Sequence, residues 1–241
     1  MKIFGKKTLA PFDWFLIIGS IFFYILHWWL VKTGHSGSGV KFSLLGAIAG
    51  MSGLIGNVLC AKRNISNYFF GIINVTLYGW IAWQNKLYGD VALNILYYLP
   101  MQFVGFYYWL KNRDEEEENN VGRVKSKRLS NRNRLLLIGI TIVSVIVVAL
   151  ILKQFNDPQP FKDSATTVIA IIAMALMVGA YMEQWWLWIV VNIISTIIWI
   201  VAYKNGGESS GEMIIKWFFN LANSINGYIV WSRASKKQNF S

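Results

Sequence analysis

Charged residues are scarce in this sequence. Asp, Glu, Lys and Arg make up 15% of the 241 residues, whereas an ordinary soluble domain carries roughly 25%. The one cysteine, Cys60, excludes an internal disulfide, and no Cys and His residues show the spacing of a zinc or iron–sulfur site. We therefore expect neither a soluble globular domain nor a bound metal or cofactor.

Acidic residues are missing from the middle of every long apolar run. Asp90, Glu183, Glu208 and Glu212 all fall near the ends of such runs. A proton- or sodium-coupled pump usually needs a charged or strongly polar relay at depth. An enzyme within the membrane needs a nucleophile, a metal cluster or a pair of carboxylates. The sequence therefore disfavours both a coupled pump and an enzyme.

Hydrophobic residues make up 55% of the chain and form runs long enough to cross a membrane. A spanning helix needs about 20 mostly apolar residues, because the hydrocarbon layer is about 30 Å thick. The runs cover approximately residues 12–31, 42–61, 67–84, 88–110, 134–152, 164–182, 185–203 and 210–231. They predict an all-α integral membrane protein with about eight transmembrane helices. Pro100, near the middle of the fourth run, predicts a kink beside a neighbouring helix or a cavity.

The net charge of +11 comes from basic residues that gather on one side of the expected helices. This bias predicts membrane orientation rather than nucleic-acid binding, and by the positive-inside rule both termini are cytoplasmic. Segment 111–133 lies on the same side and has an acidic block followed by a basic one. We expect it to be a solvated connector, and we expect the protein to lie in the bacterial inner membrane.

Short matches relate the two halves of the chain. NYFFGIIN at 67–74 aligns with WWLWIVVN at 185–192 at an offset of 118. At an offset of 122, Gly89-Asp90, Gly105 and Trp109 align with Gly211-Glu212, Gly227 and Trp231. Because three helices are an odd number, one connecting helix is needed to give a second copy the same orientation. The prediction is one extra N-terminal helix plus a 3+1+3 parallel repeat, an arrangement typical of transporters that bind substrate between their repeats.

This architecture divides the chain into six expected segments. They are the N-terminal tail with the extra helix (1–38), the first three-helix repeat (39–110), the cytoplasmic charged linker (111–133), the connecting helix (134–152), the second repeat (153–232) and a cytoplasmic tail (233–241).

Aromatic and amide side chains share one face of the seventh expected helix. Trp185, Trp188 and Asn192 stand at i, i+3 and i+7. An amide within a membrane helix needs partners and usually faces the protein interior. Further polar candidates on other helices are Asn74, Gln102, Asn220, Asn223 and Ser224. The alternatives are that the amides only join helices and that the tryptophans form an interfacial belt.

Indoles attract flat cationic rings, and neutral amides pair with other amides and with hydroxyls. These residues therefore suit a cationic aromatic ring that carries an amide and a sugar. The motifs WWLWIVVN, NYFFGIIN, LYGD and YYLPMQFVGFYYWLKN together resemble the PnuC-type nicotinamide riboside transporters, over about residues 45–232.

The resemblance implies a fold similar to that of the sugar-exporting SWEET proteins, with full three-helix repeats and a homotrimer. It implies facilitated diffusion of nicotinamide riboside, with trapping by a cytoplasmic kinase. It further implies that Trp185, Trp188 and Asn192 hold the pyridinium, that Asn74 and Gln102 line the same pocket, and that Asn220, Asn223 and Ser224 extend it. Two alternatives stay open, namely uptake of another cationic vitamin such as thiamine and a membrane scaffold that transports nothing.

Overall fold

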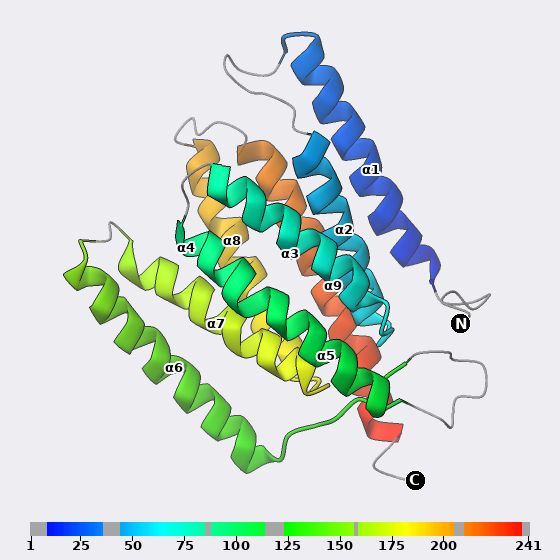
Figure 1. Ribbon diagram of the computed structural model, residues 1–241, viewed down its shortest axis with the longest axis vertical. Coiled ribbons are helices and arrows are strands. Elements are labelled where there is room, and N and C mark those ends of the chain that lie inside the picture. Colours follow the sequence, from blue (N-terminus) through cyan, green and yellow to red (C-terminus); the bar gives the residue numbers. More distant parts are fainter. Residues whose placement is uncertain are drawn as a thin grey trace.

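The computed structural model describes residues 9–35, 44–84, 88–113, 123–156, 159–204 and 210–237. In these ranges the regular elements are helices, and strand-like pairing occurs only at isolated bridges, so the all-α prediction is confirmed. The helices are α1 (Pro11–Lys32), α2 (Leu44–Ala61), α3 (Asn67–Gln84), α4 (Tyr88–Val91), η1 (Ala92–Tyr98), α5 (Leu99–Lys111), α6 (Asn131–Gln154), α7 (Pro160–Val178), α8 (Gln184–Lys204) and α9 (Ser210–Lys237) (Figure 1). Because α4, η1 and α5 follow one another without a gap, they form one span.

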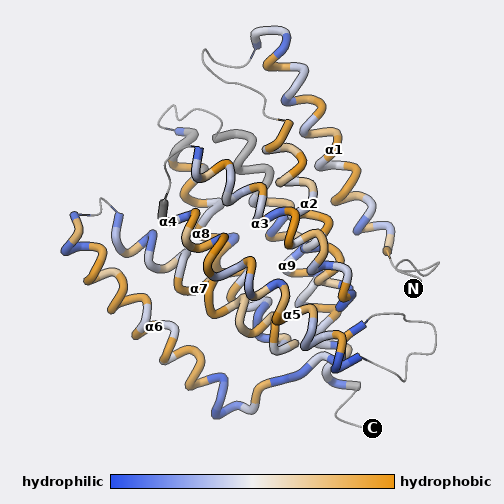
Figure 2. The backbone as a smooth tube through the Cα atoms, viewed as in Figure 1, coloured by the Kyte–Doolittle hydropathy of each residue, from blue (hydrophilic) through white to orange (hydrophobic). Residues whose placement is uncertain are grey.

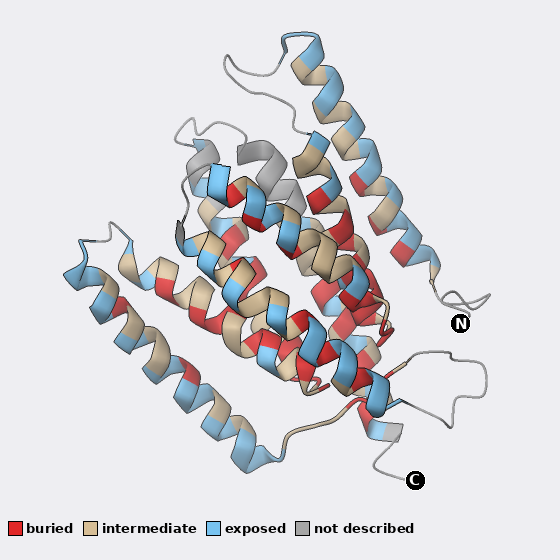
Figure 3. Cartoon of the chain, viewed as in Figure 1, coloured by how far each residue is buried: buried red, intermediate tan, exposed pale blue. Residues whose placement is uncertain are grey.

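The central helices bury their side chains, while α1 and α6 lie at the two flanks (Figures 1 and 3). Helix α1 contacts α2 and α9, and α6 contacts α7. In α6 only Thr141 and Ala149 are buried. Most residues of this helix are hydrophobic, and its two ends are polar (Figure 2). Among the described helices, α1, α2, α6 and α7 are long and apolar enough to cross a membrane. Apolar side chains that no protein segment covers are suited to lipid.

Two helix boundaries differ from the prediction for identifiable reasons. Helix α7 covers Pro160–Val178 rather than 164–182, because Pro160 occupies its first turn and Ala180 adopts a positive φ that ends it. Helix α9 continues to Lys237, so the expected tail from 233 is helical over its first five residues. Polar residues continue the helix there because Ser235 is buried against the bundle, which hydropathy alone does not reveal.

The basic half of the expected solvated connector is packed against the helices. Residues 123–129, here called the strap, include Val124 and Ser126, whose side chains are 0% and 4% exposed. The backbone N–H of Val124 donates to the carbonyl of Arg63 at 3.0 Å, and that of Lys127 donates to the carbonyl of Ala180 at 2.7 Å. The prediction is therefore wrong for the strap, because backbone carbonyls beside helix ends need donors and the strap supplies them. The acidic block, 114–118, lies outside the described residues.

The strap joins two turns of the same shape. Arg63 after α2 has φ 61°, and Ala180 after α7 has φ 59°. In the first turn the N–H of Asn64 donates to the carbonyl of Leu59 at 3.0 Å. In the second turn the N–H of Tyr181 donates to the carbonyl of Leu176 at 2.9 Å. Both are Schellman endings.

These turns are related by 117 residues, so the offset of 118 read from the sequence is one residue too large here. The side-chain amides show the same relation. Asn67 donates to the carbonyl of Asn64 at 2.8 Å, and Gln184 donates to that of Tyr181 at 3.2 Å. Asn67 thus corresponds to Gln184, and Trp185 corresponds to Tyr68.

Candidate functional site

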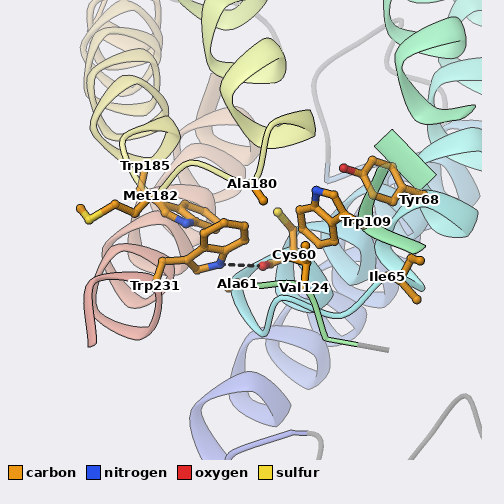
Figure 4. Close-up of a cluster of buried hydrophobic side chains, with 10 residues drawn as sticks. All are labelled: Cys60, Ala61, Ile65, Tyr68, Trp109, Val124, Ala180, Met182, Trp185 and Trp231. Carbon is orange, nitrogen blue, oxygen red and sulfur yellow. Dashed lines mark hydrogen bonds between the residues drawn. The ribbon is translucent and has the colours of Figure 1, made fainter. Parts of the chain in front are cut away.

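A layer of buried aromatic rings lies at the end of the bundle that carries the strap, here called the linker end (Figure 4). It consists of Tyr68, Trp109, Trp185 and Trp231, and we call it the aromatic layer. The ring centroids of Trp109 and Trp231 are 5.6 Å apart, those of Tyr68 and Trp109 5.0 Å, and those of Trp185 and Trp231 6.2 Å. All four residues are at most 3% exposed, so together they form a buried layer at this end of the bundle.

The structure places Trp185, a predicted substrate contact, within the aromatic layer. Its indole lies on Gly227 of α9, where a Cβ would come within 2.6 Å of the ring. The indole Nε1 is buried and has no hydrogen-bond partner among the described residues. Asn192 lies seven residues farther along α8, which corresponds to about 10 Å of helix. Trp185 and Asn192 therefore lie on the same face of α8 but at different heights along the helix axis.

Asn192 does meet two of its predicted neighbours. Its Nδ2 donates to the Oγ of Ser224 on α9 at 2.7 Å, and both side chains are buried. Asn223, next in the chain to Ser224, is 2% exposed, and its Oδ1 has no hydrogen-bond partner within the described part of the chain. An unpaired buried acceptor costs about 1–3 kcal/mol, so this oxygen is suited to a donor from a ligand or from water.

Gln102 on α5 offers a second acceptor of this kind. Its side chain is 6% exposed, and its Oε1 has no partner among the residues that the structure describes. The amide lies on Gly71 of α3, where a Cβ would come within 2.7 Å of the Gln102 Cδ. Glycine at 71 therefore leaves the space that the amide occupies.

These polar residues lie at one level of the bundle. Three of them are seven residues from a tryptophan of the aromatic layer on the same span, which is about 10 Å. The pairs are Gln102 with Trp109, Asn192 with Trp185 and Ser224 with Trp231. We call Gln102, Asn192, Asn223 and Ser224 the polar layer. Its side chains come from α5 in the first half of the chain and from α8 and α9 in the second half.

The other predicted contacts stand beside the polar layer. Trp188 is partly buried and packs against both the buried cluster that contains the aromatic layer and a second cluster around Ile169 and Val191. Asn220 is half-buried one helical turn from Ser224. Asn74 donates its Nδ2 to the carbonyl of Ala49 at 2.7 Å, which joins α3 to α2. The Asn74 amide N–H is thus used in a bond between helices, as the alternative hypothesis that the amides only join helices predicts.

A π-helical segment precedes Gln102. In η1 the N–H of Leu99 donates to the carbonyl of Asn94, one residue beyond the α-helical partner, and Pro100 follows. The Tyr97 hydroxyl donates to the carbonyl of Ile171 on α7 at 2.8 Å. Sequence reasoning predicted a kink here but missed Tyr97, because nothing in the pattern says which helix its hydroxyl meets.

Comparison with known proteins identifies the family. Residues 43–233 match the model of a family described as nicotinamide mononucleotide transporter. The chain belongs to this family. A nicotinamide riboside transporter PnuC of Neisseria mucosa is 39% identical over 195 residues, covering 81% of this chain and 74% of that protein. The protein of the same name from Haemophilus influenzae is 32% identical over 197 residues, covering 82% and 83%.

A solved structure shows the same fold. The crystal structure of the vitamin B3 transporter PnuC superposes with a TM-score of 0.77 at 34% identity, and covers 95% of this chain and 94% of that one. As a member of the nicotinamide mononucleotide transporter family, the chain is a multi-pass membrane transport protein and not an enzyme. The family match spans both Schellman turns, the strap and the polar layer, whereas α1 precedes it.

Proposed function

We propose that this chain carries nicotinamide riboside across the membrane by facilitated diffusion. The relatives named above support the substrate, and the polar layer supports it independently. Its two unpaired acceptors, Gln102 Oε1 and Asn223 Oδ1, suit the carboxamide N–H groups and the ribose hydroxyls of the riboside. Every side chain of the layer is neutral, whereas a phosphate would call for a cation. This favours the riboside over the mononucleotide in the family description.

The proposal assigns the pyridinium ring to Trp188, which stands between the two layers, through cation–π attraction. Asn192 and Ser224 hold the substrate from α8 and α9, and Gln102 holds it from α5. Direct contact by Trp185, Asn74 and Asn220 stays a prediction. In this scheme Trp185 forms the floor of the site.

Transport then proceeds by alternating access between two three-helix repeats, α2 to α5 and α7 to α9. The matching Schellman turns support such repeats. The linker end is the cytoplasmic side, because the strap and the start of α6 are rich in Arg and Lys. Both termini are cytoplasmic in this proposal. A cytoplasmic kinase phosphorylates the riboside and so traps it in the cell. The assembly is a homotrimer.

The test is uptake of radiolabelled nicotinamide riboside into proteoliposomes. We expect saturable uptake that unlabelled riboside inhibits and that thiamine and the mononucleotide do not. Asn223→Ala removes the unpaired acceptor and is expected to weaken riboside binding about tenfold, which is about 1.4 kcal/mol. Asn57→Ala, which removes an exposed amide on α2, is the matched control and should change nothing.

Each contrary outcome has a meaning. Inhibition by thiamine alone would replace the substrate and keep the transporter. No uptake of either compound by folded protein would support a membrane scaffold instead.

A further inference from the structure

Two tryptophans of the aromatic layer bond across the molecule in a reciprocal way. The Nε1 of Trp109 on α5 donates to the carbonyl of Met177 on α7 at 3.0 Å. The Nε1 of Trp231 on α9 donates to the carbonyl of Cys60 on α2 at 2.9 Å, the bond drawn in Figure 4. The last helix of each half is thus bonded to the first helix of the other half.

The two acceptors occupy the same position in their halves. Cys60 and Met177 are 117 residues apart, the offset that relates the Schellman turns, and each stands three residues before the residue with positive φ. Their carbonyls already accept the N–H of Arg63 at 2.9 Å and of Ala180 at 3.0 Å. The indoles therefore use the second lone pair of a helix-ending carbonyl. Both halves repeat the arrangement, so it is not an isolated packing contact.

The strap bonds to the same two turns and so links them. Besides its bonds to Arg63 and Ala180, it accepts the N–H of Met182 at the carbonyl of Lys127, at 2.9 Å. The Ser126 Oγ donates to the carbonyl of Trp231 at 3.3 Å, which links the strap to one of the bonded tryptophans. The linker end is thus held by both the indole bonds and the strap.

We propose that the two indole bonds close a gate at the linker end, with Trp109 and Trp231 as positioning residues. The inference rests on the proposed transport function, because it gives the state seen here a place in alternating access. The aromatic layer lies at the linker end, about 10 Å along the helices from the polar layer, and its rings are almost fully buried. A substrate in the polar layer therefore reaches this side only after the halves separate and both bonds break.

The protein carries its own reporter for this opening. The Cys60 thiol belongs to the residue that accepts the Trp231 bond, and it is 4% exposed. A thiol reagent therefore reacts with it slowly while the gate is closed. We would measure the rate of N-ethylmaleimide labelling of the full-length protein in detergent, without substrate. Cys60→Ser gives the background.

Trp109→Phe and Trp231→Phe remove the N–H and keep an aromatic ring. We expect each to speed Cys60 labelling at least tenfold and the double variant to speed it further. Trp80→Phe, which changes a tryptophan that is 56% exposed on α3, is the matched control and should leave the rate unchanged. Unchanged labelling in both test variants would overturn the gate.

A second cysteine reporter distinguishes opening of the gate from general loosening of the fold. Ser164 is fully buried on α7, 13 residues from Met177, at the opposite end of the bundle. In a Cys60→Ser, Ser164→Cys background, Trp109→Phe should leave labelling unchanged. Equal acceleration at both reporters would show that the indole bonds only stabilise the fold, and the gate would be rejected.

Separate measurements of riboside binding and riboside uptake distinguish failure of the gate from failure of the proposed transport function. Equilibrium dialysis with the riboside should give a Kd within threefold of wild type for Trp109→Phe, while uptake falls. Failure of the wild type to bind the riboside would reject the substrate and leave the labelling result intact. Loss of riboside binding in the variant alone would make Trp109 a binding residue rather than part of a gate.

Discussion

Gly71 decides where the Gln102 amide lies. We predict that Gly71→Ala displaces this amide and raises the Kd for nicotinamide riboside at least tenfold, because a Cβ at 71 would come within 2.7 Å of the Gln102 Cδ. The melting temperature in detergent should not fall in parallel, since alanine favours a helix over glycine by about 1 kcal/mol. Gly139→Ala on α6, where a Cβ meets nothing within 4 Å, is the control and should keep the wild-type Kd. An unchanged Kd for Gly71→Ala would remove Gln102 from the site.

At the same scale, the sequence predicted which residues face inward but not what each one meets. Asn192, Ser224 and Gln102 lie at one level, as a shared site requires. Trp185 has the right helical spacing from Asn192, yet seven residues are about 10 Å of helix, so a common face does not give a common level. The empty space at Gly71 has no signature in the sequence, because it exists only when α3 meets α5.

Among the described residues, an ion pair with a fully buried carboxylate links each flanking helix to the bundle at the linker end. On α6, Arg134 bonds through Nε and Nη2 to one oxygen of Glu183, at 2.9 and 2.8 Å. On α1, the carboxylate of Asp13 lies 2.9 Å from the Nζ of Lys62. Glu183 and Asp13 are fully buried, so each acid depends on its basic partner.

We predict that Arg134→Gln destabilises the protein by about 3 kcal/mol, because it leaves the buried Glu183 carboxylate uncompensated. The double variant Arg134→Gln, Glu183→Gln should be no less stable than Arg134→Gln alone. Unfolding in detergent measures the stability of Arg134→Gln, Glu183→Gln and the double variant. Asp163→Asn, which breaks an exposed pair with Lys162, is the control and should cost less than about 0.5 kcal/mol. Additive losses in the double variant would show that the pair is not coupled.

Hydropathy predicted the helices well and the connections poorly. The spans were placed within a few residues because a run of apolar side chains is a property of the sequence alone. Composition predicts a solvated strap because the residues of this segment are mostly polar. Its backbone N–H groups, which pair with the turns at Arg63 and Ala180, give no compositional signal. The continuation of α9 through Ser235 was missed for the same reason.

For the whole molecule, the position of its acids determines what can drive transport. The structure describes four acidic side chains. Asp13 and Glu183 lie at the linker end, whereas Asp90 in α4 and Asp163 in the first turn of α7 lie toward the opposite end of the bundle. None of these lies at the level of the polar layer, whose side chains are all neutral. In the proposed mechanism the riboside therefore crosses as a cation, without a proton or a sodium ion.

We predict that the membrane potential alone drives accumulation. One positive charge gains about 2.3 kcal/mol per 100 mV, which is about a 50-fold concentration ratio at equilibrium. Proteoliposomes with an inside-negative potassium diffusion potential should approach that ratio, and those at zero potential should only equilibrate. A sodium or pH gradient imposed at zero potential should add nothing. Accumulation under either gradient would contradict the uniporter and require a coupling site that the neutral polar layer does not provide.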